Sequence, residues 1–224
     1  MISAYIESHD YEVDLDATRQ LWQRAQAIGI SGAFIFSSYF TIPPLIAVFP
    51  IGGRPRITTM RFGLDSEREK RFLQRLLGLD QDEDWSGGLR NQKVQTSIIE
   101  LRSRHLTYQG MTQDYMTFFT GIIALSILRT CEAYGWEIPN DRLVRYWRYM
   151  TYASAFLGVA LKDVPATSTL CNEFTAEYSA YSDDGKKLAA IFHSVYPDYL
   201  RLCLPVLFPA TQKVIPQLLE DENA

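Results

Sequence analysis

The pattern of hydrophobic and polar positions along the chain predicts helices, and one of them is apolar almost all round. From Tyr115 to Leu128 nearly every position is apolar. A helix that is apolar on nearly every face has to be buried on every side. Thr112 is a suitable N-cap, and Gly135 is suited to end the helix after Tyr134. We therefore expect a central buried helix at Tyr115–Tyr134.

Amphipathic spacing on both sides of this helix predicts further helices. The segment Asn91–His105 has Val94, Ile98, Leu101 and His105 along one side. Before residue 91 we expect a helix capped by Asp14 or Asp16 and ended by Gly29, a helix that reaches Tyr39 before a break at Ile42-Pro43-Pro44, and a helix from Asp65 or Ser66 with Leu76 and Leu77 on its apolar face. After the central helix we expect Arg142–Leu157 behind an Asn140 cap and a helix from Thr167 or Ser168 to about Tyr181. The last predicted helices are Lys186–Val195 and Asp198–Leu204.

Alternation typical of strands is weak throughout, and the chain has no internal repeat or linker. We expect an all-α fold in which residues 1–224 form a single globular multi-helix domain. The stripe of Tyr146, Tyr149 and Tyr152 is typical of a core. The acidic, glycine-containing segment 79–90 is expected to be the most mobile loop.

Composition and charge narrow the class of protein. The chain is 47% apolar and 21% charged, which is usual for a globular protein. A net charge of -4 argues against a nucleic-acid partner. Three histidines and three cysteines without metal-ligand spacing argue against structural zinc, and the scattered cysteines indicate a reducing, cytoplasmic setting. Because the apolar run at 115–128 is shorter than the roughly 20 residues that cross a bilayer, we expect a soluble protein without a membrane span.

Four segments, taken in order, resemble one family. These segments are Ile42–Val48 with Gly52-Gly53-Arg54, then Arg61, then Thr112–Met116, and finally Trp147 with Leu157-Gly158-Val159 and Asp163-Val164-Pro165. Together they resemble the helical domain of bacterial rubber oxygenases (latex clearing proteins) and of fungal MpaB-type oxygenases from natural-product pathways. The resemblance covers roughly residues 30–170 and agrees with the all-α prediction.

The resemblance implies a cofactor and a class of reaction. Characterised relatives hold heme b between helices through a histidine ligand and cleave alkene bonds of isoprenoid chains with dioxygen. An imidazole on one side of the iron leaves the opposite side open to oxygen. The implied function is a heme b-dependent oxygenase of secondary metabolism that acts on a small apolar, isoprenoid or polyketide-like substrate.

The expected ligand position is substituted in this chain. The family histidine aligns with Arg102, and a protonated guanidinium has no lone pair for iron. His105 lies three residues further on, about 300° around a helix and close to one turn along it, so it projects near the same face. His105 is therefore the candidate metal ligand and heme-binding residue.

Arg61, Glu100 and Arg102 are the candidate catalytic residues. Arg61 also suits a heme propionate or an anionic substrate, because its planar guanidinium binds carboxylates in a bidentate way; a structural pair with Glu100 or Asp114 is the alternative. Arg102 is likewise expected either to bind a propionate or an anionic substrate or to form a structural pair with a carboxylate. Glu100, among apolar neighbours, is expected to be half-buried and to act as a general base or as the partner of a nearby arginine.

Two other functions are compatible with these residues. In the first, a heme-independent enzyme on the same fold uses the vacated apolar cavity, with Arg61, Glu100 and Arg102 catalysing a cyclisation, isomerisation or rearrangement. In the second, the protein binds a small hydrophobic molecule without catalysis.

Overall fold

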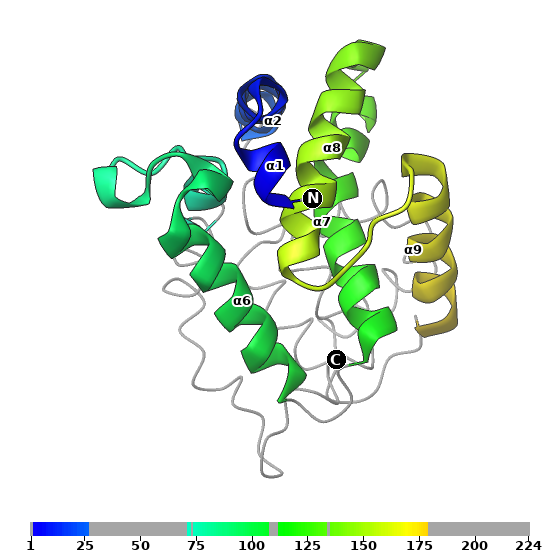
Figure 1. The fold of residues 1–224 in the computed structure, drawn as a ribbon. Coiled ribbons are helices and arrows are strands. Elements are labelled where there is room, and N and C mark those ends of the chain that lie inside the picture. Colours follow the sequence, from blue (N-terminus) through cyan, green and yellow to red (C-terminus); the bar gives the residue numbers. More distant parts are fainter. Residues whose placement is uncertain (1, 27–70, 73, 108–111, 134, 179–224) are drawn as a thin grey trace, which may run out of the picture.

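The computed structural model describes residues 2–26, 71–72, 74–107, 112–133 and 135–178 of the chain. Every regular element within these ranges is helical, so the all-α prediction is confirmed (Figure 1). Arg61, the early proline-containing segment and the last two predicted helices lie outside the described residues. The elements are α1 (Ile2–Ile6), α2 (His9–Gln26), the 3-10 helices η2 (Glu83–Trp85) and η3 (Gly88–Arg90), α6 (Gln92–Leu106), α7 (Gln113–Ala133), α8 (Asn140–Phe156) and α9 (Val164–Tyr178).

The apolar helix α7 packs against three of its neighbours, α2, α8 and α9. In Figure 1, α9 runs along one side of α7 and α8 lies on another. Side chains of α7 are buried at positions spread around the helix, as its composition requires. The buried residues of α7 are Met116, Phe118, Thr120, Ile122, Ala124, Leu125, Ile127, Leu128 and Cys131. None of the described helices combines the length and apolarity needed to cross a bilayer.

A glycine allows α7 and α9 to approach closely. A Cβ atom at Gly121 would lie 2.9 Å from both Cys171 Sγ and Thr167 Cγ2, so a larger residue here would push the helices apart. Further along the same contact, the rings of Phe118 and Phe174 stack with centroids 4.3 Å apart. Two helices are thus held together by shape complementarity at Gly121 and by apolar burial beside it.

Tyrosines join α8 to the rest of the core. Tyr146 and Tyr149 are fully buried, and their hydroxyls donate hydrogen bonds to the carbonyls of Ala124 and Leu76. These bonds matter because a buried hydroxyl without a partner is costly. Tyr152 is half-buried and stacks on Tyr5, with centroids 3.7 Å apart. The prediction that this tyrosine stripe belongs to the core is confirmed.

The segment 71–76 is helical where it is described, and Leu76 and Leu77 are buried as predicted. It ends at Gly78, whose φ of +59° is the left-handed conformation that glycine adopts readily. Arg19 of α2 covers this end: its Nε donates to the Leu77 carbonyl at 2.6 Å and its Nη2 to the Gly78 carbonyl at 3.0 Å. The helix end is therefore fixed by a side chain from a distant part of the sequence.

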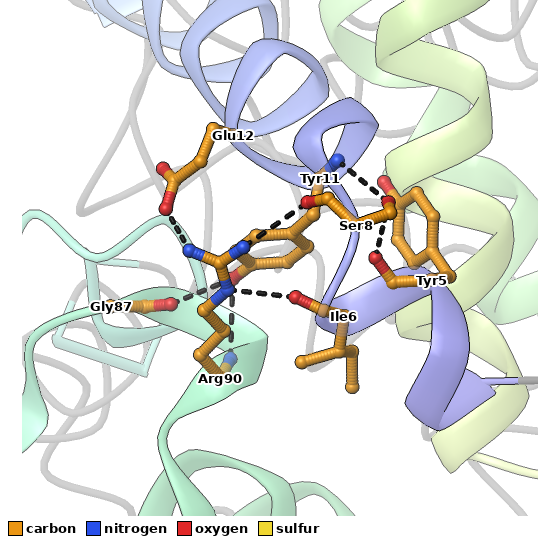
Figure 2. A network of polar contacts seen from close by, with 7 residues as sticks. All are labelled: Tyr5, Ile6, Ser8, Tyr11, Glu12, Gly87 and Arg90. Carbon is orange, nitrogen blue, oxygen red and sulfur yellow. Dashed lines mark hydrogen bonds and ion pairs between the residues drawn. The ribbon is translucent and has the colours of Figure 1, made fainter.

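The Arg90 side chain binds backbone carbonyls of the turn between α1 and α2 (Figure 2). Its Nε donates to the Ile6 carbonyl at 2.7 Å and its Nη2 to the Ser8 carbonyl at 3.2 Å, while its Nη1 pairs with Glu12. The guanidinium also lies 4.6 Å from the centre of the Tyr11 ring. Segment 79–90 contains the 3-10 helices η2 and η3 and contributes this arginine to the fold.

Asp14, predicted as a helix cap together with Asp16, lies inside α2 and is buried. Its Oδ2 accepts a hydrogen bond from the Tyr5 hydroxyl at 2.9 Å and lies 3.5 Å from Arg148 Nε. Burial raises the pKa of Asp14, although the Tyr5 hydrogen bond and the charge of Arg148 act in the opposite direction. The cap prediction was wrong because α2 begins earlier, at His9.

Two other helix starts differ from the prediction. Asn140 is the first residue of α8 and does not cap it, because Pro139 occupies the cap position and makes no side-chain hydrogen bond there. Helix α9 begins at Val164, ahead of Thr167, and the Asp163 side chain accepts a hydrogen bond from the Ala166 amide at 2.8 Å. In both places a proline adjoins the helix start and suits its first turn.

Candidate functional site

Helix α6 carries the three described candidate residues, and its apolar side faces the core. The helix begins behind Asn91, whose side chain accepts a hydrogen bond from the Lys93 amide at 2.9 Å. Val94 and Ile98 are buried, and the positions of Leu101 and His105 follow on the same side. At about 100° per residue these four positions span about 60° of the helix. In the structure Leu101 and His105 are half-buried, so the predicted apolar stripe of α6 is confirmed.

His105 is half-buried near the C-terminal end of this stripe. Burial lowers its pKa below the ordinary value of 6.5, and the positive charge of Arg104 lowers it further. A hydrogen bond with the backbone of Leu101 acts in the opposite direction. Burial therefore favours the neutral imidazole, which is the form that offers a lone pair to a metal ion.

Arg102 lies against the C-terminal end of α8. Gly158 has a φ of +72°, and a Cβ atom there would stand 2.6 Å from Arg102 Cζ, so the guanidinium occupies the space that a side chain would fill. At the same point, Gln113 Nε2 donates to the Gly158 carbonyl at 3.0 Å. Residues of the Thr112–Met116 and Leu157–Val159 segments thus meet at Gly158, next to the position where the resemblance places a ligand.

Glu100 lies on the other side of α6 and is exposed, so the expected half-burial was wrong. Positions 100 and 102 are about 200° apart around a helix, which directs the two side chains to different faces. Glu100 borders an open hollow of about 410 Å³ on this outer face. The described residues that line this hollow are Thr96, Ile99, Glu100, Ser103 and Arg104. The structure therefore does not bring Glu100 and Arg102 together.

The described residues offer one route to a metal, through a single histidine. No group of three or more His, Cys, Asp or Glu side chains among them is arranged to hold a metal ion. A heme needs less from the protein, because the porphyrin supplies four nitrogen ligands and one imidazole is enough to fix the iron. The donor chemistry of His105 fits that requirement, whereas Arg102 cannot supply a ligand.

Sequence reasoning missed two groups of interactions that involve charged residues. One is the buried contact of Asp14 with Tyr5 and Arg148, and the other is the capping of the α1–α2 turn by Arg90 (Figure 2). Each joins side chains from separate elements, and no local motif marks them. The one signal was the placement of Asp14 at helical spacing between Tyr11 and Leu21, since a carboxylate near a core needs partners.

Comparison of the chain with known protein families, with curated proteins and with solved structures found no match. The resemblance to rubber and MpaB-type oxygenases therefore rests on the sequence segments given above. Of those segments, the first two, Ile42–Val48 with Gly52-Gly53-Arg54 and Arg61, lie outside the described residues. The segments that contain Gln113 and Gly158 form one contact in the structure.

Proposed function

We propose that the chain is a heme b-dependent oxygenase that acts on a small apolar, isoprenoid or polyketide-like substrate, with His105 as the axial ligand. The observation that carries the proposal is the neutral, half-buried imidazole on the core-facing stripe of α6. Burial disfavours the charged imidazolium, and the neutral imidazole that it favours is the form that binds a metal ion. The order of the family-like segments supports the proposal independently.

In this proposal the protein supplies the heme with an axial ligand, a positive charge and a site from which water is excluded. His105 would hold one side of the iron, and the burial that lowers its pKa favours the neutral imidazole, which has the lone pair. Arg102 precedes His105 by three positions on α6, and its positive charge favours the anionic propionates of heme b. Bound heme supplies the dioxygen chemistry, in which an alkene and one dioxygen molecule yield two carbonyl groups.

The position of Glu100 is the reason we do not advance the heme-independent enzyme. Among the groups that this alternative would use, Glu100 and Arg102 are the two charged side chains within the described residues. The two side chains project from opposite sides of α6, and Glu100 is exposed. General acid–base catalysis requires groups within hydrogen-bond reach of one reacting centre, and this pair does not meet that condition.

The proposal is tested by comparing the activity of protein loaded with hemin and of protein loaded with iron-free protoporphyrin. Protein loaded with hemin and a reductant is incubated with squalene in detergent micelles under ¹⁸O₂, and carbonyl products are identified by mass spectrometry. We expect labelled carbonyl products from the wild-type protein and a loss of at least tenfold in the His105→Ala variant. Protein loaded with iron-free protoporphyrin is the cofactor control.

Two outcomes would count against the proposal. Products that form equally well with iron-free protoporphyrin would exclude heme-dependent chemistry. Squalene that binds tightly but is not converted, in protein shown to contain heme, would instead favour the hydrophobe-binding function. Far-UV circular dichroism of each variant checks that its helices are intact, so that a loss of product is assigned to chemistry and not to unfolding.

A further inference from the structure

We draw no further inference here: the strongest candidate, the open hollow on the outer face of α6 lined by Thr96, Ile99, Glu100, Ser103 and Arg104, is a partly apolar helix face for which nothing in the described structure shows what covers it.

Discussion

At the residue scale, Arg102 and His105 on α6 differ in what surrounds them. Arg102 stays charged, and its guanidinium fills the space above Gly158. His105, three positions later on the core-facing stripe, loses hydration and becomes easier to deprotonate. Within this short segment, the arginine packs against Gly158, and the histidine is the residue that we propose as the iron ligand.

The low pKa of His105 leads to a first prediction. Replacing Arg104 by Met removes a positive charge that disfavours the imidazolium, so the pKa of His105 should rise towards its ordinary value of 6.5. The measurement is an NMR titration of the imidazole ring signals. Lys93→Met, an exposed change at the other end of α6, is the matched control and should leave the midpoint in place. A midpoint that falls or stays constant in Arg104→Met would show that Arg104 does not act on His105.

The buried carboxylate of Asp14 leads to a second prediction, on the pH dependence of stability. Its pKa is raised in the folded protein above the ordinary 3.8, so the folded state keeps a proton that the unfolded chain has already released. The resulting stabilisation is fully present below pH 3.8 and is lost as the pH rises through the folded pKa. We expect Asp14→Asn to abolish this decline in the free energy of unfolding.

Urea titrations at several pH values from 3.5 upwards test the Asp14 prediction. Asp16→Asn, an exposed carboxylate change on the same helix, is the control and should keep the wild-type profile. Equal pH slopes for the wild-type protein and Asp14→Asn would contradict the assigned direction of the shift.

At the element scale, helix ends and helix crossings depend on residues that a helical pattern alone does not reveal. Gly158 ends α8 in the left-handed region, and Gly121 lets α9 approach α7. Arg90, which is far from α1 in the sequence, donates a hydrogen bond to the Ile6 carbonyl at the end of α1. These contacts fix how the helices lie against one another, and each is open to a substitution test.

Gly158 provides the third prediction. Gly158→Ala should lower the free energy of unfolding by about 2 kcal/mol, through the left-handed backbone strain and the clash with Arg102. Gly135→Ala is a matched control: its φ is +66°, but no atom lies within 4 Å of the added Cβ, so it has the strain without the clash. Chemical denaturation of both variants measures the difference.

A double mutant separates the two contributions at Gly158. Arg102→Ala removes the guanidinium, so the combination with Gly158→Ala should be less destabilising than the sum of the single changes. Additive effects, or equal losses in Gly158→Ala and Gly135→Ala, would mean that displacing the Arg102 guanidinium costs no measurable stability.

Arg90 provides the fourth prediction. Arg90→Met keeps much of the aliphatic stem but removes the hydrogen bonds to the Ile6 and Ser8 carbonyls. We expect amides of α1 and of the first turn of α2 to exchange with solvent several-fold faster, in line with a loss of about 1 kcal/mol in local stability. Hydrogen–deuterium exchange with mass spectrometry measures this. Exchange that rises equally in α9 would indicate global destabilisation instead of release of the turn.

At the scale of the whole molecule, periodicity in the sequence was enough to predict the main described helices. The spacing of Val94, Ile98 and Leu101 and the apolar run of α7 identify two of them directly. Helix starts were less predictable, because several residues near each start can serve as a cap. At α9, Asp163 takes that role ahead of Thr167, and at α8 the cap position is held by Pro139.

The sequence was enough to predict those features of the candidate site that depend on the geometry of a single helix. The separation of Glu100 from Arg102 follows from helix geometry and could have been derived from the sequence. The contact of Arg102 with Gly158 could not, because it depends on how α6 meets the end of α8. The low pKa of His105 also required the folded protein, since it depends on how far tertiary packing buries the imidazole.

The central claim, that His105 binds heme iron, is tested most directly by the visible absorption spectrum during a hemin titration. We expect a Soret band that saturates at one hemin per chain, remains in His9→Ala, which removes an exposed histidine, and is lost in His105→Ala. Added imidazole should restore the band in His105→Ala by replacing the missing ligand. A wild-type protein that gives no bound-heme band, or a band that is unchanged in His105→Ala, would contradict the account.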